Sequence, residues 1–213
     1  MSLEEYIKTG GYQMLNKCYS GELKVEQVVE EIENSGLKGM GGAGFPSGQK
    51  WKFVRMEPGP RLMTINGDEG EPGTFKDKLY LEQNIHKFFE GMLIAAWAVD
   101  AKDIYIYMRD EYPSIRLKML EEIEHLKSKN ILMPETTIHV RRGAGAYICG
   151  EETALIASIE GRRAEVDVRP PFPVTEGLYK KPTVVNNVET LAAATGILIN
   201  GPKKFSAIGN KKS

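Results

Sequence analysis

Helical and strand-like hydrophobic patterns alternate along this chain. Val25, Val28, Val29 and Ile32 recur at i, i+3, i+4 and i+7, the spacing of one apolar helix face. Arg61–Ile65, in contrast, is short and rich in apolar residues, as expected of a buried strand. By the same criteria, helices are predicted at residues 3–18, 25–36, 75–99, 113–129, 153–160 and 186–199, and strands at residues 61–65, 104–108 and 137–140.

This order of elements predicts an α/β fold. Helical segments separate successive strands, and such long crossovers favour parallel strands joined in the right-handed sense. A three-layer arrangement follows, with a parallel sheet flanked by helices. A chain of 213 residues, 41% of them hydrophobic, can bury one large core. We expect one domain over residues 1–201, opening with a helical segment at 1–36, and a basic, polar, loose tail at 202–213.

Two of the loops that follow the strands carry residues suited to ligand binding. Asn66–Gly73 reads N-G-D-E-G-E-P-G, and Gly143–Gly150 reads G-A-G-A-Y-I-C-G and leads into two glutamates. In parallel sheets, ligands lie beyond the carboxyl ends of the strands, so both loops are expected to face a ligand. The loop after the middle strand, Arg109–Glu111, has no such character.

A third glycine loop, Gly39–Gly44, matches the G-x-G-x-x-G dinucleotide fingerprint. That fingerprint requires a strand directly before it, whereas the preceding segment has helical periodicity. The loop is not a phosphate-binding P-loop either, although Lys50 could bring a cation to its ligand. A loop that only turns the chain stays an alternative.

Carboxylates dominate the candidate site. The acidic residues in its loops are Asp68, Glu69, Glu71, Glu151 and Glu152. Carboxylates suit groups that donate hydrogen bonds, such as ribose or ribityl hydroxyls, the N–H edge of a flavin and a carboxamide. A metal is disfavoured because the loops lack the alternating acidic spacing of a calcium loop.

Charge and cysteine content exclude several classes of function. The net charge of −1 gives no electrostatic case for nucleic acid. No apolar stretch is long enough for direct membrane insertion, and the N-terminus lacks signal-peptide features, so a cytoplasmic location is expected. Cys18 and Cys149 are far apart in sequence and cannot hold an iron–sulfur cluster between them.

Four segments together resemble a known family. They are Gly39–Trp51, Asn66–Asp77, Gly143–Ser158 and Pro182–Ala192, in this order. The chain is similar, from about Tyr6 onward, to the NADH-binding flavoprotein subunit of respiratory complex I, the 51-kDa type. It also resembles the related subunits of NAD-linked hydrogenases and formate dehydrogenases.

The resemblance implies a Rossmann-like domain that binds FMN and NAD(H), with no catalytic side chain and no metal ligand. Asn186, Asn187 and Thr190, at the start of the last helix, would hold the ribityl phosphate, a suitable place for an anion. Phe45, Phe53 and Phe172 would stack on the bases of the dinucleotide, and Glu71 would bond to it. The remaining implied cofactor-binding residues are Gly39, Gly41, Gly42, Gly44, Lys50, Asn66, Asp68, Glu69, Tyr147, Gly150, Glu151 and Glu152.

The implied activity is that of an FMN-dependent NADH:acceptor oxidoreductase subunit, of the quinone-linked type. Hydride would pass from NADH to FMN, and single electrons would pass on to an iron–sulfur partner. In the family a 4Fe-4S cluster is bound by a later cysteine motif, whose ligands are absent from this sequence. Implied partners are iron–sulfur subunits of a larger complex, among them a thioredoxin-like 2Fe-2S subunit, which would hold the chain peripherally on the inner face of a membrane.

Two other functions stay open at this point. The chain could be a docking subunit without activity, or a flavin relay protein that does not use NADH. The chain also departs from the family at three positions. Met40 stands where arginine is usual, Ala157 where asparagine or glutamate is usual, and Arg169 where lysine is common. These departures bear on affinity for the nicotinamide nucleotide.

Overall fold

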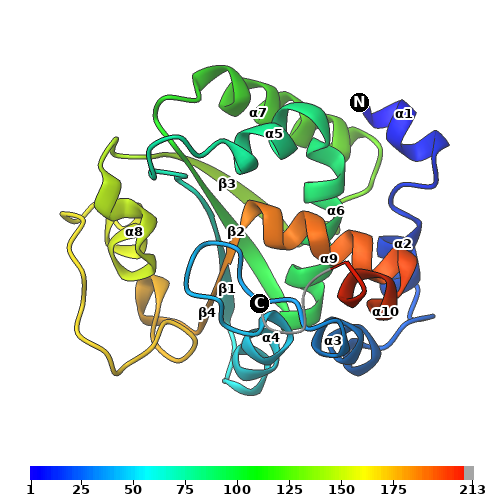
Figure 1. Ribbon diagram of the computed structural model, residues 1–213, viewed down its shortest axis with the longest axis horizontal. Helices are drawn as coiled ribbons and strands as arrows, with labels where there is room; N and C mark the ends of the chain where they lie inside the picture. The colour runs from blue at the N-terminus through cyan, green and yellow to red at the C-terminus, as the bar shows by residue number, and fades with distance from the viewer. Residues whose placement is uncertain (209–213) are drawn as a thin grey trace.

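A parallel four-stranded sheet between two layers of helices forms the centre of the molecule (Figure 1). The computed structural model describes residues 1–208, and in it the strand order is β3-β2-β1-β4 with every neighbouring pair parallel. The strands are β1 (Arg61–Gly67), β2 (Ala101–Met108), β3 (Thr137–Arg142) and β4 (Thr183–Asn187). The α-helices are α1 (Leu3–Lys8), α2 (Gln13–Tyr19), α3 (Val25–Asn34), α4 (Ser47–Met56), α5 (Lys76–Gln83), α6 (Ile85–Val99), α7 (Pro113–Ser128), α8 (Glu152–Ile159), α9 (Val188–Asn200) and α10 (Pro202–Ser206), and the short 3-10 turns are η1 (Tyr147–Gly150) and η2 (Leu178–Lys180).

The two faces of the sheet are covered unequally. The larger core lies on the face covered by α6 and α9, which pack tightly because Gly91 lies against the backbone of Leu191. A Cβ at Gly91 would come within 2.0 Å of the Leu191 carbonyl oxygen. The smaller core lies on the other face, where α8 and Leu178 cover Tyr105 and Val185. The predicted three-layer α/β fold is confirmed.

Two long predicted helices are each divided in the structure. The segment at 3–18 forms α1 and α2, separated at Gly10, whose φ of +92° is incompatible with a continuous right-handed helix. The segment at 75–99 forms α5 and α6, separated at Asn84, whose φ of −135° and ψ of 43° are not helical.

Besides the 3-10 turns and α10, one strand and one helix were not predicted. Strand β4 overlaps the start of the predicted helix 186–199. Asn186 and Asn187 are the last two residues of the strand, and the helix begins at Val188. Helix α4 follows the glycine loop and carries Lys50 and Phe53. Its mixed polar and aromatic sequence has a weak apolar stripe, although Trp51 and Val54 are buried.

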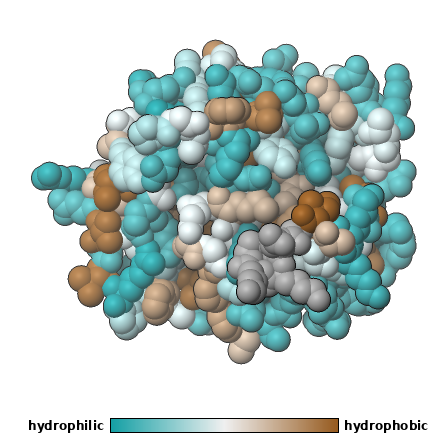
Figure 2. All heavy atoms as spheres, in the orientation of Figure 1, coloured by the Kyte–Doolittle hydropathy of each residue, from teal (hydrophilic) through white to brown (hydrophobic). Residues whose placement is uncertain are grey.

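The end of the chain departs from the expected loose tail. Pro202–Ser206 form helix α10, and Phe205 packs against the larger core. Residues 209–213 of the predicted tail lie outside the described residues. Within residues 1–208, no helix combines the length and apolar character needed to cross a bilayer. Figure 2 shows a largely hydrophilic face, with hydrophobic residues at its left edge over the segment between α8 and η2, where Val166 and Val168 are exposed.

Candidate cofactor-binding site

Two adjoining cavities lie at the carboxyl ends of the strands. The first, here the Arg169 cavity, has a volume of about 330 Å³, and the second, the Glu71 cavity, about 420 Å³. The Arg169 cavity is lined by Gly39, Gly41, Ala43, Gly44, Phe45, Ser47, Lys50, Asn66, Gly150, Glu151, Glu152, Arg169, Val185, Asn186, Asn187 and Thr190. The Glu71 cavity is lined by Met40, Gly41, Gly42, Asn66, Glu69, Gly70, Glu71, Thr74, Lys76, Asp77, Tyr147, Ile148, Gly150, Glu151 and Asn187.

The two cavities share a floor. Gly41, Asn66, Gly150, Glu151 and Asn187 line both of them. The Asn66 amide donates to the Gly150 carbonyl at 2.8 Å and so joins the loop after β1 to the loop after β3. Two ligands placed in the two cavities would therefore lie next to each other and contact the same residues.

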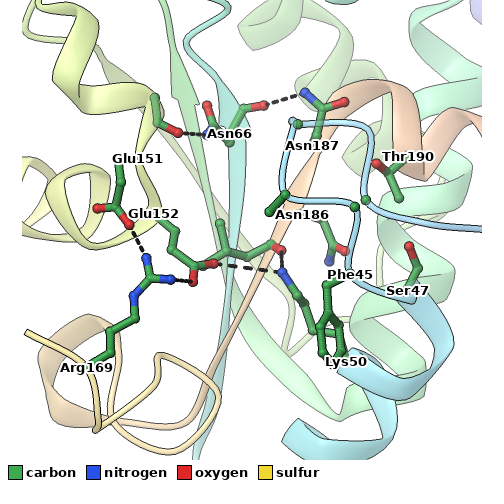
Figure 3. A pocket seen from close by; sticks show the side chains of 16 residues that line it. Phe45, Ser47, Lys50, Asn66, Glu151, Glu152, Arg169, Asn186, Asn187 and Thr190 are labelled. Atoms are coloured by element: carbon green, nitrogen blue, oxygen red, sulfur yellow. Dashed lines mark hydrogen bonds and ion pairs between the residues drawn. The ribbon is translucent and has the colours of Figure 1, made fainter. Parts of the chain in front are cut away.

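The Arg169 cavity contains two cations and two carboxylates among its described lining residues. The guanidinium of Arg169 bonds to Glu151 and lies 3.2 Å from Glu152, as Figure 3 shows. The Lys50 ammonium donates to the Val185 carbonyl at 3.2 Å and lies 3.8 Å from Glu152. The formal charges of this lining balance.

Burial lowers the pKa of one of these groups, and hydrogen bonding lowers the pKa of another. Burial lowers the pKa of Lys50 below its ordinary value, although the nearby Glu152 carboxylate opposes the change. Burial alone would raise the pKa of Glu151, but hydrogen bonds from the side chain and backbone of Thr153 and from the Ala154 N–H lower it instead. Glu151 thereby serves as the N-cap of α8 and is held as a carboxylate in the shared floor.

The Glu71 cavity is acidic. Its described lining carries four carboxylates, from Glu69, Glu71, Asp77 and Glu151, and the ammonium of Lys76. The carboxylate of Glu69 accepts from the backbone N–H groups of Asp77 and Lys78, so it stabilises the start of α5. By contrast, exposed Glu71 bonds to the Tyr147 hydroxyl at the edge of the cavity.

Asp68 lies behind the Glu71 cavity, outside the lining of both. Its side chain is buried and faces a small cavity of about 50 Å³ that also contains Arg109 and Glu111. Burial raises the pKa of Asp68 to about 6, and the positive charge of Arg109 opposes that rise. Direct contact with a ligand in either main cavity thus stays a prediction for Asp68.

The two asparagines at the junction of β4 and α9 have different roles. Asn187 caps α9 by accepting from the Glu189 N–H at 3.0 Å, and its amide nitrogen donates to Asp77 at 2.6 Å. Asn186 is 5% exposed, and its amide nitrogen has no hydrogen-bond partner among residues 1–208. The Thr190 hydroxyl accepts from the Met40 N–H at 2.9 Å, which fixes the glycine loop against α9.

Of the predicted aromatic residues, Phe45 lines the Arg169 cavity. The ring of Phe53 lies 6.3 Å from that of Phe45, beside the cavity but outside its lining. Phe172 is exposed and lines neither cavity. The structure therefore brings together all the predicted site residues around the two cavities except Asp68, Phe53 and Phe172.

Several lining residues were not predicted as site residues. Arg169 was noted only as a departure from the family, yet it pairs with both glutamates of the site. Lys76 and Asp77 fall within the Asn66–Asp77 segment that carries the resemblance, which was the available signal for them. Ser47 lies at the first position of α4, an element that the sequence analysis did not predict.

The family model described as "Nuo51 FMN-binding domain" matches residues 32–195, which contain this site. The chain belongs to the Nuo51 FMN-binding domain family. The resemblance inferred from the four segments is thereby confirmed.

Relatives in this family are subunits of redox complexes. The chain is 46% identical to an NADH-quinone oxidoreductase subunit of Aquifex aeolicus, over 98% of this chain and 50% of that protein. It is 43% identical to the alpha subunit of the NAD-reducing hydrogenase HoxS of Cupriavidus necator, over 94% and 34% respectively. A solved NAD+-reducing [NiFe]-hydrogenase in the H2-reduced state matches with a TM-score of 0.84 and 42% identity, over 89% of this chain and 33% of that one. The chain thus spans about half the length of the Aquifex aeolicus protein.

Proposed function

We propose that this chain binds FMN and NADH side by side and passes hydride from the nicotinamide to the flavin, as part of an NADH dehydrogenase module. The observation that carries the proposal is the pair of cavities with one shared floor. Hydride transfer needs two flat rings in direct contact, and cavities that share lining residues would bring two ligands side by side.

The residues present fit a flavin nucleotide. Positive φ angles at Gly42 and Gly44 let the glycine loop curve around a ligand, with no side chain between backbone and cavity. The unpartnered amide of Asn186 is a donor that a bound ligand would satisfy. The first turn of α9 suits the phosphate, and the carboxylates suit ribityl and ribose hydroxyls. FMN, when bound, supplies a two-electron acceptor that can release electrons singly.

Four side chains at the site would then have distinct roles in binding the two nucleotides. Lys50, between Val185 and Glu152, would hold an anionic or carbonyl group of a ligand. Glu71 would accept hydrogen bonds from the dinucleotide at the outer edge of the site. Phe45 and Phe53 would cover a flat ring and exclude water. None of these residues needs to exchange a proton with the reacting atoms.

We further propose that electrons leave to an iron–sulfur subunit, with quinone as the final acceptor. Support comes from the relatives, because the Aquifex aeolicus protein is named as a subunit of an NADH-quinone oxidoreductase. The Cupriavidus necator relative is named as a subunit of an NAD-reducing hydrogenase, so a hydrogenase module is the second candidate for the parent complex. A thioredoxin-like 2Fe-2S partner and a peripheral place at a membrane belong to the same proposal.

The test is the visible spectrum of the purified chain with FMN, before and after anaerobic addition of NADH. Bound flavin bands that bleach with NADH are expected. Flavin bands that persist would indicate a flavin relay that does not use NADH. Failure to bind flavin at all would leave a docking subunit and would contradict the proposal.

A further inference from the structure

Lys76 lies where helix dipoles disfavour a cation. It is the first residue of α5, and its ammonium lies 3.1 Å from the side-chain oxygen of Asn187, the N-cap of α9. The N-terminus of a helix carries partial positive charge and therefore attracts anions rather than cations. Nearby acidic groups must account for the position of this lysine.

Two carboxylates hold the ammonium. It lies 2.7 Å from Asp77 and 3.3 Å from Glu189, which is in the first turn of α9. The side chain of Asp77 is 3% exposed, so water screens its charge weakly. Without Lys76, both carboxylates would repel any anion that approached the start of α9.

Independent evidence for a ligand comes from Asn186, next to the same helix terminus. The side-chain oxygen of Asn186 accepts from the Trp51 indole at 3.4 Å, whereas its buried amide nitrogen is unpartnered within the described part of the chain. Asn186 and Thr190 line the Arg169 cavity, and Asn187, whose side-chain oxygen Lys76 contacts, lines both cavities. A buried donor without a partner is costly, so a ligand acceptor at this place would stabilise the structure.

We propose that Lys76 is a positioning residue that neutralises Asp77 and Glu189, so that the first turn of α9 accepts the phosphate of the flavin nucleotide. This inference rests on the proposed function. Lys76 also bonds to the Asn187 oxygen, so it fixes the side chain that caps α9. Lys76 acts on the phosphate through Asp77, Glu189 and Asn187. It thereby favours binding of FMN over riboflavin, which has no phosphate.

The test compares FMN with riboflavin, which has the same ring and ribityl chain but no phosphate. Calorimetric titration of the Lys76→Met variant should give an FMN affinity at least about tenfold weaker than that of the parent chain. Riboflavin affinity should change by less than about twofold, because no phosphate is involved. Lys78→Met is the matched control, since Lys78 is on the same helix and pairs with Glu82 instead.

Two further variants keep the test decisive if Lys76→Met folds poorly. Lys76→Arg should restore preference for FMN, and Glu189→Gln alone should raise the ratio of FMN to riboflavin affinity. Equal losses for both flavins in Lys76→Met, or an unchanged ratio in Glu189→Gln, would overturn the role of Lys76. A parent chain that binds neither flavin would instead contradict the proposed function.

Discussion

The two cavities share a floor but differ in charge. The Arg169 cavity balances Lys50 and Arg169 against Glu151 and Glu152, whereas the described lining of the Glu71 cavity opposes four carboxylates with Lys76. A phosphate is therefore better accommodated in the Arg169 cavity, and hydrogen-bond donors or a cationic ring in the Glu71 cavity. The difference indicates that one acidic site can take an anionic nucleotide because its cations are concentrated on one side.

The sharpest test of this comparison removes Lys50, the half-buried cation of the Arg169 cavity. Lys50→Met leaves Glu152 without its nearby ammonium and the cavity with excess negative charge. We expect bleaching of bound flavin by NADH to slow by about 30-fold or more, as removal of a charged hydrogen-bond partner of a ligand typically does. Stopped-flow absorbance measures this rate. Lys52→Met is the control, because Lys52 is exposed on the same helix, and a loss as large in that variant would contradict a specific role for Lys50.

The acidic side can be probed through Asp68, whose pKa is raised to about 6 by burial. In the unfolded chain the carboxyl ionises near its ordinary pKa of 3.8, so the native state binds more protons between these values and stability falls as pH rises through them. Asp68→Asn should therefore stabilise the protein near pH 7 by up to about 3 kcal/mol. The gain should disappear below about pH 4, where both forms are neutral.

Urea unfolding near pH 7 and below about pH 4, monitored by tryptophan fluorescence, measures the free energy of unfolding and checks this prediction. A gain of equal size at both pH values would mean that the effect of the substitution is not one of charge.

Substitution of Arg169 tests whether the charge balance of the Arg169 cavity depends on the ion pairs of Arg169 with Glu151 and Glu152. Arg169→Ala should weaken NADH binding by about tenfold, because Glu151 and Glu152 both lose their guanidinium partner. Arg169→Lys introduces the residue that is common in the family and keeps the positive charge, so it should recover most of the affinity for NADH. Recovery should be incomplete, because an ammonium cannot bridge both glutamates as the guanidinium does. Titration of flavin-loaded protein with NADH gives the dissociation constants.

Arg163→Ala serves as control for Arg169, because Arg163 is in the same loop and pairs with Glu165 in solvent. If Arg169→Ala bound NADH as tightly as the parent chain, Arg169 would have no part in binding the dinucleotide.

The smallest expected effect concerns Glu71. Glu71→Gln removes a negative charge from the Glu71 cavity and should raise the two-electron potential of a flavin bound at the shared floor by about 20 mV. Spectroelectrochemistry measures the shift. Tyr147→Phe removes the hydroxyl contact with Glu71 but keeps the charge, so its potential should stay at the parent value. An unchanged potential in Glu71→Gln would place that carboxylate away from the flavin.

Much of the fold and site could be predicted because it depends on local sequence. Alternating helix and strand patterns indicated the parallel α/β arrangement, and the rule that ligands lie beyond strand ends identified the loops at Asn66 and Gly143. Sequence periodicity missed β4, because Thr183–Asn187 is short and runs directly into α9. It also missed α4, whose buried residues Trp51 and Val54 are too few to form a clear stripe.

Residue types alone determined that this protein would hold glycine-rich loops and carboxylates at one edge of a parallel sheet. Tertiary structure decided how each group is used. In the folded chain Asn187 caps α9, whereas the amide nitrogen of Asn186 has no partner among residues 1–208. These adjacent asparagines differ because successive side chains of a strand point to opposite faces. Tertiary structure also set Arg169 and Lys76 against carboxylates distant in sequence. Charge pairing of this kind depends on distances in space, which only the folded chain fixes.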